Sequence, residues 1–407
     1  MKNHFRIFLC FFGFLAIGNA QNIAVSNFNF NKKVTDTVFY HPNDSIKQVD
    51  LIDYLRKYLK VKPPKTQRNK RKFQFSLFPA EATTAGGRTV VTSFNASFLL
   101  GDISKTNVST IYFVPYISFS DQYGFQLRPD IWLNNNNWNF TGEYFVLNYP
   151  QSTWGLGGSS LEENETMVDY KHIRVYQNVL KGILPYFSVG IGFNYDNHFD
   201  VKVEEPKISY LNQADNQTIS SGFAFPVVYD SRKNSNNPRN GVLANLTYRL
   251  NTPFLGSNNN WQSVFFDFRK YFPLNNKMKD IIAVRSYYWS VVSGKVPYLD
   301  LPANNWEPTS GRVARGIEQN RYRSNAMLYS ETEYRFGITR DGFLGGVIFS
   351  NIVSASEYQT QNFMKWHPAA GFGLRMKFNK YSHINVTLDY GFSKGYQSLY
   401  LNIAEVF

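Results

Sequence analysis

Hydrophobic and polar residues alternate along the chain from Phe73 to Phe407. In the segment 371–378, Phe, Leu, Met and Phe fall on one face, while Gly, Gly, Arg and Lys fall on the other. The segment 384–390 repeats this pattern. Because successive side chains of a strand point to opposite faces, a period of two predicts β-strands. The same alternation predicts further strands near residues 88–100, 108–120, 122–133, 137–148, 169–181, 184–195, 218–230, 241–251, 260–272, 279–292, 322–336, 342–354 and 398–407.

The apolar face of these strands could contact either lipid or the interior of a soluble protein, because a soluble sandwich also alternates apolar with polar residues. The predicted segments have about 9 to 13 residues, which suits the roughly 9 to 11 tilted residues that cross a bilayer. Aromatic residues gather at segment ends, for example at Tyr271, Phe272 and Tyr400, as in the girdles of membrane barrels. A sheet in lipid must close on itself to satisfy its backbone groups. We therefore predict an all-β fold, a transmembrane antiparallel β-barrel.

The composition agrees with this class. Hydrophobic residues make up 43% of the chain, aromatic residues 17% and charged residues 18%, which excludes an intrinsically disordered chain. Beyond the N-terminus, no stretch approaches the roughly 20 apolar residues that a spanning helix needs. The formal net charge of +13 would attract phosphate groups, so outer-membrane lipids and lipopolysaccharide are expected partners.

Residues 1–20 have the features of a signal peptide, which predicts an exported protein. Lys2 and Arg6 supply the positive end, an apolar run follows, and small residues precede Gln21. The sole cysteine, Cys10, lies inside this leader. The mature chain is therefore expected to have no thiol for disulfides, nucleophilic catalysis or metal ligation.

Residues 21–72 are predicted to form a periplasmic extension with one short helix. Ser45 and Gln48 have the spacing of a capping box, and apolar residues then recur at helical spacing as far as Leu59. Pro63 ends the pattern. We expect this helix to pack on the periplasmic mouth of the barrel, where a periplasmic partner can bind, or to lie at a membrane surface.

A basic run follows the predicted helix. From Lys60 to Lys72 the chain carries seven basic residues and no acidic one. A solvated tether and a contact with phospholipid head groups are the two interpretations that fit it. Nucleic acid is not an expected partner, because aromatic residues are not interleaved with the basic ones and the chain is exported.

Three groups of residues further along the chain form a recognisable series. The first consists of Asp230-Ser231-Arg232 with Pro238 and Gly241. The second consists of Ala314-Arg315-Gly316-Ile317 with Arg321, Tyr322 and Arg323. The third consists of Gly371-Phe372-Gly373-Leu374-Arg375, Leu388-Asp389-Tyr390-Gly391-Phe392 and Phe407. In order and spacing these groups resemble the motifs of BamA/TamA-type bacterial surface-antigen barrels, whose conserved loop reads Val-Arg-Gly followed by Phe or Tyr.

The resemblance implies that residues 73–407 form a sixteen-stranded outer-membrane barrel of a Gram-negative-type bacterium, with the Arg-Gly loop folded into the lumen. With roughly 10 residues per strand in the membrane, this stretch also accommodates twelve or fourteen strands with longer loops. An arginine in a narrow lumen needs a carboxylate partner, because an unpaired buried charge costs several kcal/mol. Glu331, Glu333 and Asp389 lie on the polar side of their predicted strands and are the candidates for Arg315. Where the family often has an aspartate, this chain has Asn351.

The end of the chain resembles the signal that the barrel-assembly machinery reads. We predict that Phe407 shares a lipid-facing side with Leu401 and Ile403. Assembly factors of this type also carry polypeptide-transport-associated (POTRA) domains before the barrel. Residues 21–72 are too few and too basic for one complete copy.

Two classes of function follow. The first is a gated barrel for outer-membrane protein assembly, translocation or lipid handling, and the alternative is a passive pore or a structural barrel that contacts lipopolysaccharide. We do not expect an enzyme or a bound cofactor, since no histidine has a metal spacing or a serine in a recognisable elbow. Ser382 and His383 are adjacent, so in a strand they face opposite sides and cannot share a proton.

Overall fold

The computed structural model describes residues 48–60, 73–84, 87–102, 105–118, 121–204, 215–232, 234–274, 280–305, 313–380 and 383–407. All of them belong to the unit Val38–Phe407. The predicted signal peptide, Ser45 of the predicted capping box, most of the basic run and Ser382 lie outside the described residues.

Strands dominate the described chain, as the period-two pattern predicted. In chain order they are β1 (Phe73–Thr84), β2 (Gly87–Phe98), β3 (Ser109–Ser118), β4 (Tyr123–Trp132), β5 (Trp138–Asn148), β6 (Gln151–Thr153), β7 (Thr166–Leu184), β8 (Phe187–Val203), β9 (Gln217–Asp230), β10 (Gly241–Asn251), β11 (Trp261–Pro273), β12 (Ile281–Gly294), β13 (Ala326–Gly337), β14 (Leu344–Ala355), β15 (His367–Asn379), β16 (Ile384–Ser393) and β17 (Tyr396–Ile403). The α-helix α2 (Leu51–Tyr58) precedes them, and short 3-10 turns are η2 (Asn134–Asn136), η3 (Glu162–Asn164), η5 (Pro253–Leu255) and η6 (Tyr298–Asp300).

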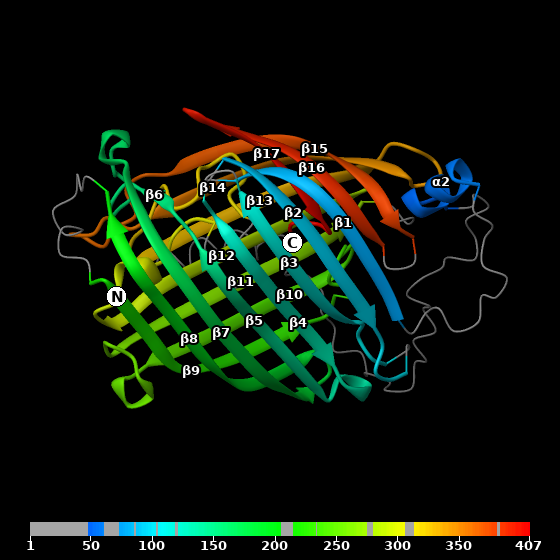
Figure 1. The fold of residues 1–407 in the computed structure, drawn as a ribbon. Helices are drawn as coiled ribbons and strands as arrows, with labels where there is room; N and C mark the ends of the chain where they lie inside the picture. Colours follow the sequence, from blue (N-terminus) through cyan, green and yellow to red (C-terminus); the bar gives the residue numbers. More distant parts are fainter. Residues whose placement is uncertain are drawn as a thin grey trace, which may run out of the picture. The chain divides into compact units, whose positions relative to one another are not determined.

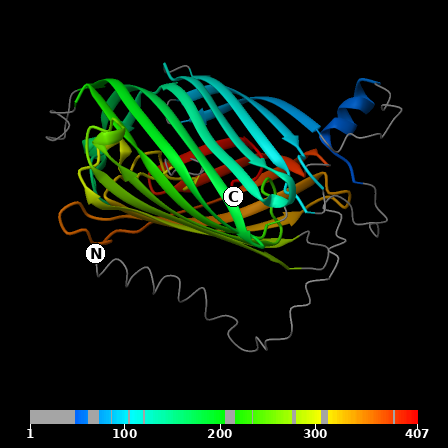
Figure 2. The same cartoon turned by 90° about the horizontal axis from the view of Figure 1, so that it is seen from below.

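Apart from the short strand β6, each strand pairs in antiparallel register with the next one from β1 to β17. The three-residue β6 pairs with β7, the strand that also pairs with β5, so β5 and β6 occupy one position in the sheet. The strands wrap around a common axis (Figures 1 and 2), and β1 lies beside β17. The predicted all-β antiparallel barrel is therefore confirmed.

The two faces of the sheet differ as a membrane barrel requires. On β15, Phe372 and Leu374 point outward and are each 57% exposed, whereas Arg375 points inward and is 4% exposed. On β11, Asp267 and Arg269 point inward and form an ion pair of 2.6 Å. The outward face is thus apolar and suited to lipid, while the lumen is polar and filled by side chains.

The helix α2 lies where the turns between β13 and β14 and between β15 and β16 meet (Figure 1). It begins later than the capping-box pattern predicted. Its N-cap is Asp50, whose carboxylate accepts a hydrogen bond from the Asp53 backbone N–H at 2.8 Å and another from the Lys380 N–H at 3.0 Å. Gln48 instead accepts a hydrogen bond from Lys377. No helix among the described residues is long and apolar enough to cross a membrane.

The last four residues correct the prediction that the final strand runs to residue 407. The strand β17 ends at Ile403, and Ala404 has a φ of 73°, which turns the chain toward the lumen. Val406 and Phe407 then pack against Tyr271 and Ala283 on the inner face of the sheet. Charge contributes to this turn as well as apolar contact, because the Glu405 carboxylate lies 2.7 Å from Arg375 and 3.9 Å from Arg335, two inward-facing arginines.

Candidate functional site in the barrel lumen

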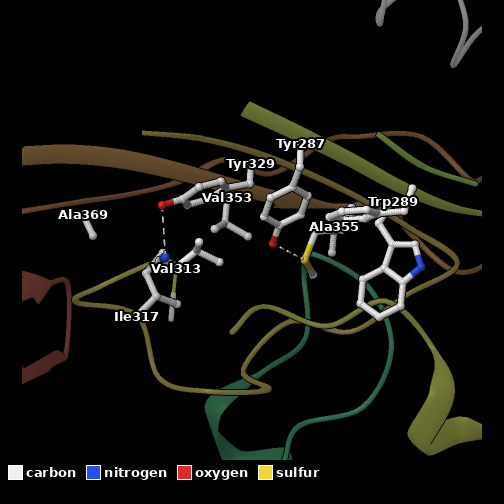
Figure 3. Close-up of a cluster of buried hydrophobic side chains, with 11 residues drawn as sticks. Tyr287, Trp289, Val313, Ile317, Tyr329, Val353, Ala355 and Ala369 are labelled. Atoms are coloured by element: carbon white, nitrogen blue, oxygen red, sulfur yellow. Dashed lines mark hydrogen bonds between the residues drawn. The ribbon is translucent and has the colours of Figure 1, made fainter. Parts of the chain in front are cut away.

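The long connection between β12 and β13, residues 295–325, is folded into the barrel; we call it the lumen loop. Its described residues are 295–305 and 313–325. Val313, Ala314 and Ile317 are buried against a group of inward-facing residues of the wall. Figure 3 shows this contact, in which Val313 and Ile317 lie beneath Tyr329 and Val353. This apolar contact stabilises the position of the loop, because it removes water from the apolar surfaces of the loop and of the barrel wall.

Arg323 braces the lumen loop internally. Its side chain is completely buried, and Nη1 donates hydrogen bonds to the carbonyl oxygens of Tyr298 at 2.9 Å and Leu299 at 3.0 Å. Nη2 donates to the side chain of Asn320 at 2.9 Å. The two ends of the loop are therefore held together by one guanidinium, which gives the loop a defined shape.

Arg315 joins the lumen loop to the barrel wall. Its side chain is 1% exposed, and Nη1 lies 2.5 Å from Oδ2 of Asp389 on β16. Nη2 contacts Glu331 and Glu333 on β13, and the guanidinium stacks 3.7 Å from the ring centroid of Phe349. The structure thus brings Arg315 together with all three carboxylates that were candidate partners from the sequence. Charges this deeply buried are stable only when they are paired.

Two backbone contacts reinforce this anchor. Gly316 has a φ of 90°, and its N–H donates a hydrogen bond to the Tyr400 hydroxyl at 2.9 Å. A Cβ atom at this position would lie 2.6 Å from the backbone nitrogen of Phe392, so only glycine fits. Asn351 donates a hydrogen bond to the Arg315 carbonyl oxygen at 2.9 Å. The residue that departs from the family pattern therefore still contacts the loop.

The anchor belongs to a larger ionic network in the lumen. Asp389 also pairs with Arg375 at 2.5 Å, and Arg375 pairs with Glu405 at 2.7 Å. Glu333 pairs with Arg335 at 2.5 Å. The network therefore runs from the lumen loop, through the wall, to the C-terminal residues.

Two further residues of the lumen loop that were predicted from the sequence, Arg321 and Tyr322, contact segments outside the loop. Arg321 donates hydrogen bonds to the side chain and the carbonyl oxygen of Ser160, at 2.8 and 2.9 Å. Tyr322 stacks on His367 with ring centroids 3.7 Å apart. These contacts link the lumen loop to the connection before β7 and to the beginning of β15.

A second anchor, which the sequence reasoning missed, holds the lumen loop to another part of the wall. Asp300 is buried and accepts a hydrogen bond from the hydroxyl of Ser220 on β9 at 2.6 Å. Its other carboxylate oxygen lies 3.8 Å from Nδ1 of His198 on β8. The only signal in the sequence was an aspartate between two apolar residues, Leu299 and Leu301, in a polar loop.

The wall beneath the second anchor carries its own charge cluster. Asp196 on β8 is completely buried and contacts His172 at 2.9 Å, Arg174 at 2.7 Å and Arg249 at 3.0 Å. The rings of His172 and His198 stack 3.9 Å apart. Period-two counting puts these residues on one face, but it cannot tell which strands meet.

The mid-barrel motif forms the turn between β9 and β10. Arg232 makes a two-pronged ion pair with Asp230, at 2.9 and 2.8 Å, while Pro238 is buried. Gly241 has a φ of 100°, and a Cβ there would lie 2.7 Å from the Ser231 carbonyl oxygen. The sequence motif thus fixes the two ends of this connection, at Asp230 where β9 ends and at Gly241 where β10 begins.

The turn between β9 and β10 reaches across the barrel. Asn236 accepts a hydrogen bond from the Tyr112 hydroxyl on β3 at 2.5 Å, and its carbonyl oxygen accepts one from the Glu405 N–H at 3.1 Å. Asn237 donates to the His383 carbonyl oxygen at 3.0 Å. The turn and the C-terminal residues therefore cover the lumen at the end of the barrel that carries α2.

The C-terminal residues contribute side chains to this end of the lumen. Phe407 is 2% exposed, and its carbonyl oxygen accepts a hydrogen bond from Arg335 at 2.9 Å. Leu401 remains on the outward face of β17, where it pairs with Leu388, and Ile403 packs beside Val386. The expectation that Phe407 shares their lipid-facing side is therefore corrected, because the turn at Ala404 reverses the direction of the side chain.

Residues 92–394 match the model of the Omp85 superfamily domain. No curated protein matches the chain in sequence. The fold resembles BamA from Haemophilus ducreyi lacking POTRA domains 1–3, with a TM-score of 0.53 and 14% identity over 82% of this chain and 70% of that one.

Two further structures resemble the fold. CdiB from Acinetobacter baumannii has a TM-score of 0.54 and 11% identity over 82% of this chain and 60% of that one. CdiB from Escherichia coli has a TM-score of 0.52 and 10% identity over 82% of this chain and 67% of that one. At these identities the likeness is one of fold. The family match covers most of the chain, and the predicted resemblance and outer-membrane location are confirmed: the chain is an outer-membrane β-barrel that belongs to the Omp85 superfamily.

Proposed function

We propose that this protein is a gated barrel for the assembly or translocation of outer-membrane or exported polypeptides, with the lumen loop as its movable plug. The observation that carries this proposal is the double anchoring of the loop. Arg315 is held by carboxylates of β13 and β16, and Asp300 is held by Ser220 of β9. A loop attached to two parts of the wall occupies the lumen, whereas the lumen of a passive pore is a water-filled channel.

The arrangement of the first and last strands supports the same proposal. The strands β1 and β17 lie beside each other, yet among the described residues β1 forms its ladder with β2 and β17 forms its ladder with β16. A sheet opens most easily where few backbone hydrogen bonds have to break. The boundary between β1 and β17 is therefore the part of the wall that we expect to separate.

The proposed organisation of the chain follows the sequence prediction. Residues 1–20 serve as the signal peptide, residues 21–72 as the periplasmic extension and residues 73–407 as the barrel. The α2 end of the barrel, which carries Phe407, then faces the periplasm. A periplasmic partner at this mouth and the barrel-assembly machinery are the expected partners.

Conductance in planar bilayers tests the plug. We expect small, flickering currents from the unaltered protein and larger currents from Arg315→Ala, because the loop loses its attachment to β13 and β16. Arg340→Ala, a change at an exposed arginine in the turn between β13 and β14, serves as the matched control. Steady currents that are the same in all three proteins would instead indicate a passive pore.

Depletion of the protein, followed by an outer-membrane proteome, tests the role in assembly or translocation. We expect other barrels or surface proteins to disappear from the outer membrane while inner-membrane proteins remain. An unchanged outer-membrane proteome with altered permeability would favour the alternative, a pore or a structural barrel that contacts lipopolysaccharide.

A further inference from the structure

The helix α2 is fixed to the barrel through its N-terminal part, from the N-cap Asp50 to Tyr54. The Lys380 ammonium lies 2.5 Å from the Asp53 carboxylate, and the ring of Tyr54 lies 4.5 Å from that of Phe343. Asp50 caps the helix and bonds to the backbone of Lys380. These contacts set the rotation of the helix about its axis, so they also decide which side chains point away from the barrel.

Beyond Tyr54, the large apolar side chains of α2 and its C-cap are exposed. Leu55 is 48% exposed, Tyr58 is 85% exposed and Leu59 is 64% exposed. Together with Leu51 they follow the spacing i, i+4, i+7 and i+8, which forms one stripe along a helix. A stripe of large apolar side chains in water is unfavourable, so it indicates a surface that is covered in the native setting.

The apolar stripe is continuous with the lipid-facing surface of the barrel. Leu51 packs against the cluster formed by Phe378, Ile384, Val386 and Ile403, and so does Met376. Met376 and Phe378 continue the outward-facing row of β15 that includes the exposed Leu374. The outer face of the barrel contacts lipid, so the stripe leads directly from that surface to the end of α2.

The residues around the stripe are basic. Arg56, Lys57 and Lys60 flank it, and the sequence continues to Lys72 with further basic residues and no acidic one. The acidic Asp53 is already paired with Lys380. Long basic side chains beside an apolar stripe are the composition that binds the boundary between acyl chains and anionic head groups.

We propose that α2 is an interfacial helix that binds anionic phospholipid in the membrane leaflet at its end of the barrel. The apolar stripe lies among the upper parts of the acyl chains, and the basic residues contact the phosphate groups. This role is independent of the lumen loop, because none of the α2 contacts described above involves that loop.

Fluorescence of the full chain in lipid nanodiscs tests the proposal. Cys10 is replaced by serine, and a single cysteine is introduced as Tyr58→Cys for labelling with an environment-sensitive dye. Gln359→Cys, at an exposed position in the connection between β14 and β15 at the opposite end of the barrel, is the matched control. Both positions are exposed, so neither change is expected to affect folding, and a heat-modifiable gel shift verifies this.

Nanodiscs of phosphatidylcholine with phosphatidylglycerol are compared with nanodiscs of phosphatidylcholine alone, each with a lipid-attached quencher. With phosphatidylglycerol we expect strong quenching at residue 58 and little at residue 359. Replacing Arg56, Lys57 and Lys60 by glutamine should weaken the partitioning of the helix by on the order of fivefold for each charge. A label at residue 58 that is as water-exposed as the control in both lipids overturns the proposal, and equal quenching in both lipids overturns the assignment of anionic head groups.

Discussion

Arg315 of the lumen loop and Asp389 of β16 form a buried ion pair of 2.5 Å, although 74 positions separate them in the chain. The same carboxylate group pairs with Arg375, which in turn pairs with Glu405 near the end of the chain. One aspartate thus connects the lumen loop to the C-terminal residues, through Arg375. A change at either end of this network alters the charge balance at the other.

Replacing Arg315 with alanine should lower the stability of the folded barrel. The change leaves Glu331, Glu333 and Asp389 with fewer partners, and removal of one member of a buried ion pair costs about 3–5 kcal/mol. The measurement is the urea concentration at which half of the refolded protein in detergent is unfolded, and the heat-modifiable gel shift reports the folded fraction. Arg340→Ala should lower the midpoint much less, because Arg340 is exposed and an exposed ion pair contributes at most about 1 kcal/mol. A midpoint for Arg315→Ala equal to this control would contradict the docked loop.

Replacing Gly316 with alanine should release the lumen loop without removing any charge. The added Cβ would lie 2.6 Å from the backbone nitrogen of Phe392, which cannot move without disturbing β16. Gly256 is the matched control, because it also has a φ of 90° but has nothing within 4 Å of its added Cβ. Both changes carry a backbone cost on the order of 1–3 kcal/mol.

Single-channel conductance separates these two glycine variants. We expect larger and longer openings from Gly316→Ala and unaltered currents from Gly256→Ala. If both variants behave alike, backbone strain alone explains the effect and the docking of the loop does not.

The second anchor should appear as a coupling between Asp300 and Ser220. Burial raises the pKa of Asp300 to about 7. Its hydrogen bond with Ser220 therefore contributes about 0.5–1.5 kcal/mol while the carboxyl is protonated and about 1.5–3 kcal/mol once it is ionised, so Asp300→Ala and Ser220→Ala should be non-additive by this order. The measurement is a double-mutant cycle on the free energy of unfolding in detergent. The pair Asp300→Ala and Arg340→Ala is the control and should be additive. If Asp300→Ala and Ser220→Ala are also additive, the result would contradict the second anchor.

Phe407→Ala should destabilise the barrel even when it is refolded without any assembly machinery. The ring packs in the lumen against Tyr271, and loss of a buried phenylalanine costs about 3–5 kcal/mol. Leu399→Ala, at a lipid-facing position on β17 that is 50% exposed, is the control and should cost less. Cellular assembly of both variants is measured in parallel.

The two results on Phe407 distinguish its roles. A normal urea midpoint with reduced membrane assembly would support a signal that is read before folding and would contradict the lumen contact. A lowered midpoint with normal assembly would support the lumen contact and leave the predicted assembly signal without support.

Much of the fold followed from local pattern. Strands such as β10 and β11 were predicted within one or two residues, because alternation is a property of neighbouring positions. The start of α2 was misplaced, because Asp50 is selected as N-cap by its contact with Lys380, which is distant in sequence. The end of β17 was misplaced for a similar reason, since Glu405 turns inward to meet Arg375.

The residues of the candidate site also fall into those that could be predicted from the sequence and those that could not. Arg315 and its three candidate carboxylates could be named from the sequence, because a motif marked the loop and period-two counting marked the inward side chains. Asp300, Ser220 and the cluster around Asp196 could not be found, because their proximity depends on how far the lumen loop enters the barrel.

The amino-acid sequence by itself determined which side chains face lipid and which face the lumen, since one residue of shift would expose every charge to hydrocarbon. The tertiary structure alone decided which lumen charges meet. Curvature of the sheet brings strands from different parts of the chain around one narrow space, and each buried charge there must find an opposite charge from whichever strand, loop or terminal segment lies within reach.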